Sequence, residues 1–450
     1  HYIAGPLGAQ SSPTTNLREA PDGTVLVATR RNVLRMDAGT VRWVTGFGSP
    51  RGDQVGESGA ALLPLAYAGQ AGPASMEGVL IVGTSVENES TGNGNPVLKG
   101  PLAQRFGYDG GEQWNRTLAV GAGGQLRAVQ SACTRFAPRG TSCNAVVVVD
   151  PNFDGGPENR ELLAQVIDPN GDDAGVATLM PQARRVCDFR RDDAFAADGR
   201  PTLRALVSDA ADRLGTIALD DRGSVQASFA PVGGTHRCGD FRSGLPAPRV
   251  SPDGRVARVE RSATRADTVE LVVTAADGAE RLRVAFREID AVEDVGIHRA
   301  RAVLQTDDDG DGRADDGYLV ALDAFNGLWT NDAVAMLAKF DATGTLVWLR
   351  DYPGLYYGYL YADVSRRLVQ IFEGAGSARR PVGNAFVATA SPGGGQFPLQ
   401  LVRVDASGSV AGPRVVLADL HDASSGRAAL APTGDGGLIA VTGSVVARLG

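Results

Sequence analysis

A tight turn that carries an aspartate and a glycine recurs seven times in this chain of 450 residues, each time between two strand-like runs. Successive turns begin 53 to 72 residues apart, which suits one small sheet and its connections. A hairpin signal with this period indicates an all-β repeat architecture in which each repeat forms one sheet. The turns are Asp37 to Gly39, Asp109 to Gly111, Asp168 to Gly171, Asp221 to Gly223, Asp277 to Gly278, Asp341 to Gly344 and Asp405 to Gly408.

The repeat order predicts a single β-propeller domain over residues 1–450, with eight four-stranded blades. Runs such as Val79 to Val82 and Leu271 to Thr274 suit sheets packed on both faces, and no segment keeps a helical period. The last repeat matches the first strand for strand but stops one strand short. We therefore expect Tyr2 to Gln10 to supply that strand, so that the terminal strands pair and close the ring. Seven blades is the alternative if an insert-rich repeat is misassigned.

Composition excludes several classes of protein. Hydrophobic residues make up 43% of the chain, which is enough for a folded core, and the net charge of −8 argues against nucleic-acid binding. No apolar run reaches the ~18 residues that a membrane-spanning helix needs. The chain begins with His1 instead of Met, so we expect a processed product that is secreted, periplasmic or on the surface of a bacterial cell.

Four cysteines allow three disulfide pairings, and their spacing does not form a Cys-x-x-Cys metal or redox motif. They are Cys133, Cys143, Cys187 and Cys238. The first two bracket one short loop, and we expect disulfides and an oxidising compartment.

Cys187 and Cys238 stand in two sister motifs, Arg185 to Arg190 and Arg237 to Arg242. One interpretation is a disulfide that joins neighbouring blades, with Asp–Arg pairs fixing the strand ends. The other is a binding face, whose residues are Asp188, Arg190, Asp240 and Arg242. We favour the structural interpretation.

An acidic loop between Val149 and Leu162 matches the calcium pattern Asp-x-Asn-x-Asp-Gly with a later Glu. Alternate residues of such a loop point oxygens inward, and glycine at the sixth position permits the bend. The flanks are strand-like, so the loop resembles an EF-hand loop placed on a β-hairpin; a solvated acidic turn is the alternative. The expected ligands are Asp150, Asn152, Asp154, Glu158 and Glu161.

A second loop, Asp307 to Asp316, has six carboxylates in ten residues, and their mutual repulsion calls for a cation. It resembles the calcium hairpins of integrin-α-type propeller repeats. That likeness implies Ca²⁺ held by Asp307, Asp309, Asp311 and Asp315 and by the carbonyl of Arg313. A third, weaker candidate consists of Asp168, Asn170, Asp172 and Asp173, which lack the glycine at the sixth position.

Several turns are followed by a tryptophan: Trp43, Trp114 and Trp348. The segment Ala338 to Trp348 resembles the tryptophan-docking repeat of pyrroloquinoline-quinone-type eight-bladed propellers, and also the short repeats of secreted bacterial propellers. The quinoprotein likeness covers three repeats and lacks the adjacent-cysteine disulfide of the alcohol-oxidising members. It therefore implies the architecture and not the enzyme.

Five of the nine tyrosines stand close together. If exposed, they form a binding patch that stacks on sugars or on a protein partner. If buried, they are ordinary sheet packing, which we favour. They are Tyr352, Tyr356, Tyr357, Tyr359 and Tyr361.

These features favour a non-enzymatic, calcium-stabilised extracellular or cell-surface propeller that acts as a binding or structural subunit. The expected partners are other surface or extracellular proteins or a polysaccharide, with self-association as a further option. The alternative is a propeller enzyme, a quinoprotein oxidoreductase or a carbohydrate-active enzyme, with its site at the axial channel.

Overall fold

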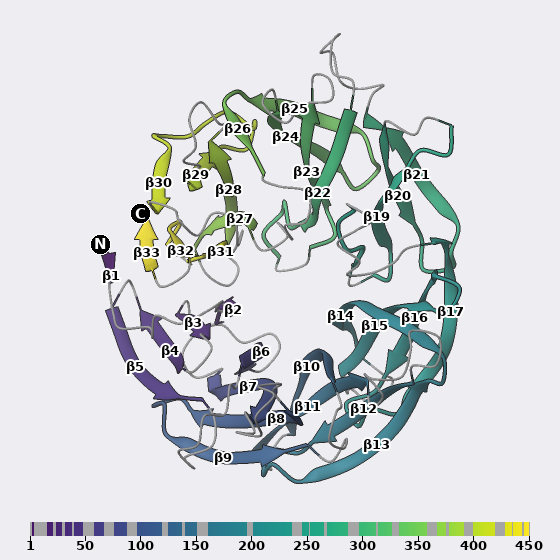
Figure 1. Ribbon diagram of the computed structural model, residues 1–450, viewed down its shortest axis with the longest axis vertical. Coiled ribbons are helices and arrows are strands. Elements are labelled where there is room, and N and C mark those ends of the chain that lie inside the picture. The colour runs from purple at the N-terminus through teal and green to yellow at the C-terminus, as the bar shows by residue number, and fades with distance from the viewer. Residues whose placement is uncertain are drawn as a thin grey trace. The chain divides into compact units, whose positions relative to one another are not determined.

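The computed structural model describes most strands and their tight turns and part of the longer connections. The described residues are 2–3, 16–20, 24–28, 32–37, 40–47, 58–66, 76–87, 97–118, 125–136, 140–150, 161–195, 201–235, 245–251, 253–264, 268–286, 297–311, 314–325, 333–357, 367–374, 378–390, 399–418, 428–433, 435–442 and 445–449. They form eight small antiparallel sheets and no helical element (Figure 1). The all-β prediction is confirmed.

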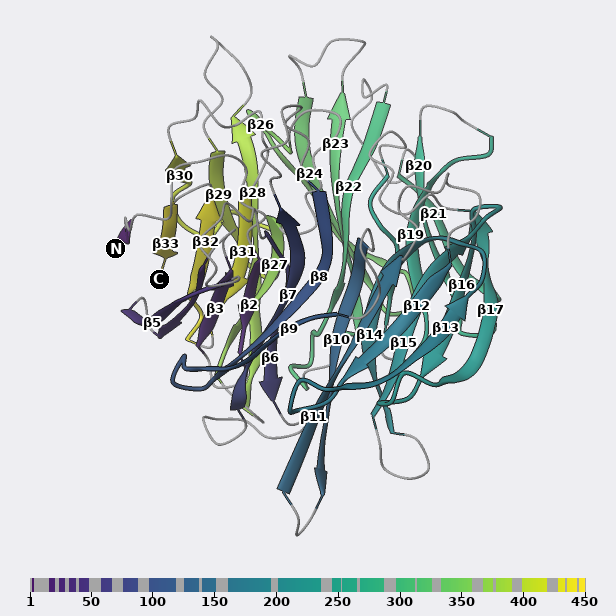
Figure 2. The same cartoon turned by 60° about the horizontal axis from the view of Figure 1, so that its bottom comes forward.

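The chain divides into two compact units, which the sequence pattern does not predict. They are an N-terminal unit of residues 7–235 and a C-terminal unit of residues 1–6 and 236–450. The N-terminal unit holds four sheets in chain order. They are β2 (Asn16–Glu19), β3 (Val25–Ala28), β4 (Asn32–Asp37) and β5 (Thr40–Gly46); β6 (Ser58–Ala66), β7 (Met76–Glu87), β8 (Val97–Gly107) and β9 (Glu112–Thr117); β10 (Gln125–Phe136), β11 (Gly140–Asp150), β12 (Leu162–Ile167) and β13 (Asp173–Met180); β14 (Ala183–Phe195), β15 (Pro201–Asp209), β16 (Arg213–Leu219) and β17 (Val225–Thr235). The β10–β11 hairpin extends well past the rest of its sheet (Figure 2).

The C-terminal unit also holds four sheets. They are β18 (Arg249–Val250), β19 (Val256–Arg261), β20 (Val269–Thr274) and β21 (Glu280–Ala285); β22 (Ile297–Thr306), β23 (Gly317–Phe325), β24 (Ala333–Asp341) and β25 (Leu346–Tyr352); β26 (Leu355–Tyr356), β27 (Leu368–Glu373), β28 (Arg380–Ala390), β29 (Leu399–Val404) and β30 (Val415–Ala418); β31 (Ala428–Pro432), β32 (Leu438–Thr442), β33 (Val445–Leu449) and β1 (Tyr2–Ile3). β26 and β27 both pair with β28, so the first strand of that sheet is interrupted.

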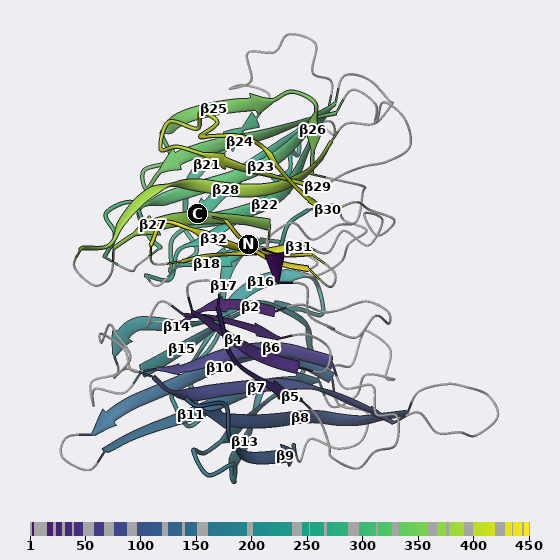
Figure 3. The ribbon, with the colours of Figure 1, turned by 90° about the vertical axis from the view of Figure 1, so that its left-hand side faces the viewer.

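The last sheet takes a strand from each end of the chain. Tyr2 lies opposite Ala447 and Ile3 opposite Val446, and the chain ends lie near one another beside this sheet (Figure 3). This is the pairing expected for residues 2–10, of which 4–10 lie outside the described residues. The closure of all sheets into one ring stays a prediction.

The core lies between consecutive sheets within each unit. The inner strands β3 and β20 are buried at every position, whereas the fourth strand β5 alternates between exposed and half-buried residues. One cluster, for example, combines Leu271 of β20 with Val320 and Phe340 of the next sheet. Sheets covered on both faces explain why their central strands are runs of Val, Leu and Ile without polar alternation.

The recurrent aspartate shapes the turn between the third and fourth strands. In the turn that follows β24, the Oδ1 atom of Asp341 accepts hydrogen bonds from the backbone N–H of Thr343 at 2.9 Å and of Thr345 at 2.9 Å. Asp405 and Asp168 make the same pair of bonds in their turns. In the fourth repeat Asp220 does so, not Asp221 as the sequence pattern suggested.

We expect these turns to make stability depend on acid pH. The pKa of Asp341 and that of Asp405 are lowered, and the largest cause is a hydrogen bond from a hydroxyl, of Thr343 and of Ser407 respectively. Burial raises both pKa values, and backbone N–H groups lower them further. The unfolded carboxyl therefore binds its proton at a higher pH than the folded one, so stability is present above the unfolded pKa and is lost as pH falls. At pH 6 the Asp405→Asn variant should unfold at a lower urea concentration than the wild type, and the difference between the two unfolding midpoints should shrink towards pH 3. An equal difference between the midpoints at both pH values would contradict this prediction.

The tryptophans dock on the turn of the next sheet. In the N-terminal unit the Trp43 Nε1 donates to the Tyr108 carbonyl at 3.1 Å, and Trp114 Nε1 to that of Pro169 at 2.9 Å. In the C-terminal unit Trp348 Nε1 donates to the Ala406 carbonyl at 2.8 Å. Each indole therefore ties two consecutive sheets together, which agrees with the resemblance to a tryptophan-docking repeat.

Candidate metal centre

The Asp307–Asp316 loop connects β22 to β23. Gly310 bends the loop with a φ of 79°, a conformation that favours glycine. A Cβ atom at this position would overlap the carbonyl oxygen of Arg379, so the loop backbone lies directly against the neighbouring sheet. Gly312 and Arg313 lie outside the described residues.

Three carboxylates of this loop converge. One oxygen each from Asp307, Asp309 and Asp316 lies within 4.8 Å of the others. Calcium binds oxygen ligands at about 2.3–2.6 Å, so ligands of one ion can be up to about 5 Å apart. The donor set is entirely oxygen, which suits hard cations such as Ca²⁺, Mg²⁺ and Mn²⁺ better than Zn²⁺ or copper. These residues therefore fit a calcium ion.

The loop contacts the sheets on both sides of its own. Gln370 of β27 brackets Asp307: its Oε1 accepts from the Asp307 N–H at 2.9 Å, and its Nε2 donates to the Asp307 carbonyl at 3.0 Å. On the opposite side Arg255, which follows β18, donates from Nη2 to the Asp315 carbonyl at 2.6 Å. Three consecutive sheets of the C-terminal unit thus meet at this loop.

Two protein cations pair with the loop. The Arg379 Nη1 lies 3.1 Å from the Oδ2 of Asp307, and the Lys339 Nζ lies 2.7 Å from the Oδ2 of Asp308. The Lys339 side chain is largely buried, and it also hydrogen-bonds Thr306. Both cations offset part of the negative charge of this loop.

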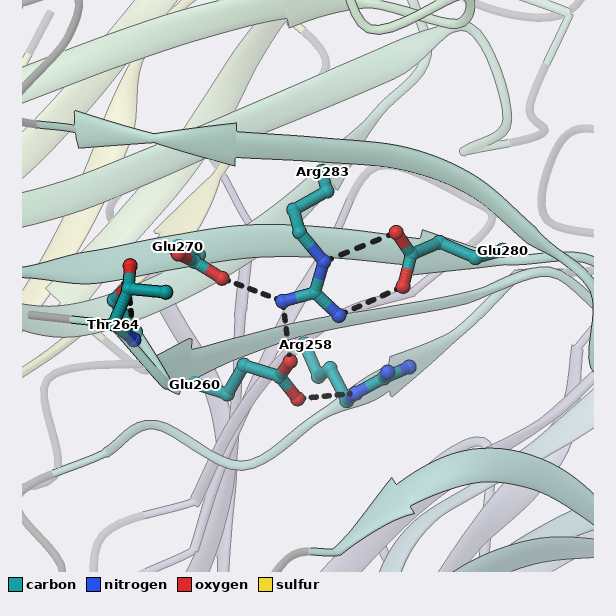
Figure 4. A network of polar contacts seen from close by, with 7 residues as sticks. Arg258, Glu260, Thr264, Glu270, Glu280 and Arg283 are labelled. Atoms are coloured by element: carbon teal, nitrogen blue, oxygen red, sulfur yellow. Dashed lines mark hydrogen bonds and ion pairs between the residues drawn. The ribbon is translucent and has the colours of Figure 1, made fainter.

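Another acidic cluster in the same unit is partly neutralised by two arginine side chains of its own sheet. On the β18–β21 sheet, Arg283 reaches Glu260 at 2.7 Å, Glu270 at 2.5 Å and Glu280 at 2.7 Å (Figure 4). Arg258 also pairs with Glu260, at 3.0 Å. Here two guanidiniums offset two of the three carboxylate charges, and each of the three carboxylates has an arginine partner.

The acidic neighbours of Asp315 in the Asp307–Asp316 loop affect its pKa. Partial burial raises the pKa of Asp315 above its ordinary value, and the neighbouring carboxylates of Asp316 and Asp311 raise it further. A bound cation would reverse the second of these effects.

The converging carboxylates coincide only in part with the ligands expected from the sequence, since Asp311 and Asp315 are not among them. Asp307 and Asp309 belong to both sets, but the third carboxylate of the cluster is Asp316. Its Oδ2 accepts from the backbone N–H of Asp308 at 2.7 Å and of Asp309 at 3.0 Å, which draws it over the loop. Asp311, a predicted ligand, is exposed, and its backbone N–H donates to Asp309.

The other loops are less informative. Of the first predicted calcium loop, Asn152, Asp154 and Glu158 lie outside the described residues; Asp150 ends β11, and Glu161 accepts a hydrogen bond from Thr178 at 2.8 Å. In the third candidate, Asp168 accepts two backbone N–H groups of its own turn, which explains this aspartate without a metal.

The cysteine predictions are described in part. Cys133 lies directly opposite Cys143 in the β10–β11 register, and opposed strand residues are at a separation that a disulfide can bridge. Cys187 is disulfide-bonded, but Cys238 lies outside the described residues, so both pairings stay predictions. In the same motif Arg190 pairs with Asp188 at 3.0 Å; Asp240 and Arg242 are not described.

The tyrosine segment is packed inside the C-terminal unit. Tyr352, Tyr356 and Tyr357 are at most 5% exposed, which supports sheet packing and not a binding patch. The Tyr352 ring lies 4.9 Å from that of Phe386. Tyr359 and Tyr361 lie outside the described residues.

No family model matches this chain, and no curated protein matches it. Among solved structures, the WD40 domain of SCAP from fission yeast is similar over 100% of this chain and 94% of that chain, at 7% identity and a TM-score of 0.47. A Synechocystis apocarotenoid oxygenase mutant is similar over 77% and 74%, at 13% identity and a TM-score of 0.40. A eukaryotic initiation factor is similar over 91% and 89%, at 9% identity and a TM-score of 0.37. Because these TM-scores are low, we draw nothing about this chain from them.

Within the described part of the chain, no helix has the length and apolar character needed to cross a membrane.

Proposed function

We propose that the eight sheets are blades of one β-propeller, and that the protein is a calcium-stabilised binding or structural subunit outside the cell. The repeated docking of tryptophan on the next turn and the cores between consecutive sheets support the propeller. The observation that carries the function is the convergence of Asp307, Asp309 and Asp316 in a loop that three sheets share.

Calcium would be held by these three carboxylates and would act as a structural clamp. Arg379 and Lys339 already offset part of the charge, which lowers the affinity for a cation. An affinity in the range of about 10⁻⁴–10⁻³ M, typical of extracellular modules, is therefore expected. This supports a secreted, periplasmic or cell-surface location, where other surface proteins or a polysaccharide are the available partners.

The test is thermal unfolding with calcium and with a chelator, while light scattering reports the size of the particle. A fall in the melting temperature on chelation at constant size supports a monomeric, calcium-clamped binding protein. A change in size places calcium at an assembly contact, and no change in either quantity overturns the metal centre. An absorption band from a bound quinone would instead support the oxidoreductase alternative.

A further inference from the structure

The three docked indoles share one geometry, which defines what we call a seat. The ring lies against the turn glycine of the next sheet, and the indole N–H donates to the carbonyl two residues before that glycine. A Cβ atom on Gly110 would come within 2.6 Å of Trp43, one on Gly171 within 2.7 Å of Trp114, and one on Gly408 within 2.8 Å of Trp348. The seat therefore has a glycine floor and a carbonyl acceptor.

One seat of the C-terminal unit has no tryptophan. The strand register places Leu282 opposite Val273, the position that Trp348 occupies opposite Lys339 in the next sheet. Leu282 is half-buried and lies on Gly344, the turn glycine of that next sheet. The floor of the seat is thus present, with a smaller side chain upon it.

The carbonyl acceptor of this seat is also present, and it accepts only one long hydrogen bond among the described residues. It is the carbonyl of Ala342, which is reached by the Arg255 Nη1 at 3.5 Å. The indoles reach their acceptors at 2.8 to 3.1 Å. At the seat under Gly223, which also lacks a tryptophan, the Asn144 amide replaces the indole and donates to the Asp221 carbonyl at 3.0 Å. A distance of 3.5 Å is at the limit for a hydrogen bond.

A cavity of about 600 Å³ opens at this seat. Binding pockets for small organic groups measure about 300–1,000 Å³, so an indole ring fits. Its apolar lining includes Leu282 and Val273. The lining also contains four charged residues, Asp253, Arg255, Asp277 and Arg281.

We propose that this cavity binds a tryptophan side chain presented by a partner polypeptide, with the indole on Leu282 and its N–H on the Ala342 carbonyl. An indole is the occupant that the repeat suggests, because three tryptophans of this chain donate to the equivalent turn carbonyls, and here Leu282 covers the glycine but offers no donor to the carbonyl. This inference names the partner chemistry for the proposed binding role. Arg255 contacts both the cavity and the calcium loop, but the test uses indole probes and not calcium, so its failure and that of the metal centre are distinguishable.

The experiment is ligand-observed NMR of the intact chain with three probes: N-acetyltryptophanamide, indole and 1-methylindole, the last of which lacks the N–H donor. We expect the capped tryptophan and indole to bind, and 1-methylindole to bind several-fold more weakly. Equal binding of indole and 1-methylindole would overturn the proposed hydrogen bond from the indole N–H to the Ala342 carbonyl. Binding of free indole without the capped tryptophan would overturn the polypeptide partner.

Two variants locate the binding. Leu282→Trp fills the seat from within and should abolish binding while raising the melting temperature. Ala276→Phe narrows the cavity from an exposed turn position, so it tests the same seat if the first variant does not fold. Val347→Ala, at a side chain that is 56% exposed on β25, is the matched control and should bind like the wild type. Unchanged binding in both cavity variants would overturn the proposal.

Discussion

Gly408→Ala is expected to lower the free energy of unfolding by about 2–5 kcal/mol, one of the two largest effects that the structure predicts. The residue has a φ of 81°, where an L-residue other than glycine costs about 1–2 kcal/mol. The added Cβ would also come within 2.8 Å of the Trp348 ring, and overpacking costs about 1–3 kcal/mol more. The ring cannot retreat easily, because its N–H is fixed to the Ala406 carbonyl at 2.8 Å.

The matched control for this variant is Gly412→Ala. Gly412 has a φ of 89°, but a Cβ there would meet no atom within 4 Å. The control should therefore lose about 1–2 kcal/mol, from the backbone alone. Urea unfolding measures the loss of unfolding free energy in each variant. The difference between the two losses is the contribution of the contact between Trp348 and the turn. Equal losses would mean that the indole does not press on the turn.

The second prediction concerns calcium. Asp316→Asn should lose most of the stabilisation that calcium provides through this loop, while Asp311→Asn should keep most of it. At a calcium concentration of 100 times Kd, one site contributes about 2.7 kcal/mol. Asparagine at position 316 can still accept the backbone N–H groups of Asp308 and Asp309, so the loop keeps its shape and loses the charged ligand.

The readout is the shift of the melting temperature between calcium and chelator. Any contribution from the 150–161 loop remains in both variants, so their comparison isolates the second loop. If Asp311→Asn loses the larger part, the ligand set implied by the integrin-α likeness is right and the Asp316 convergence is wrong.

The sequence predicts much of the fold because its signals are local. In four turns the aspartate accepts N–H groups two and four residues further on, so its spacing to glycine is set within one hairpin; these aspartates are Asp168, Asp220, Asp341 and Asp405. The acidic loop is recognisable for the same reason. The sequence pattern assigns the turn to Asp221, whereas Asp220 accepts the backbone N–H groups of Arg222 and Ser224. Both carboxylates precede Gly223, and only the backbone conformation decides which of them accepts these hydrogen bonds.

The remaining features depend on contacts between repeats. Gln370 and Arg379 lie more than sixty residues beyond Asp307, and no local pattern connects them to it. The seat that Leu282 occupies does leave a signal, because leucine stands at a position where other repeats have tryptophan. That signal becomes informative only when the register shows which residues are equivalent.

The most direct test of the account is hydrogen–deuterium exchange of the intact protein with and without calcium, read in peptides that cover the loop and both neighbouring sheets. If calcium clamps three sheets together, exchange slows at 307–316, at β27 around Gln370 and at the turn that carries Arg255. Slowing that is confined to 150–161, or an unchanged rate at all three places, would contradict a structural calcium ion at Asp307, Asp309 and Asp316.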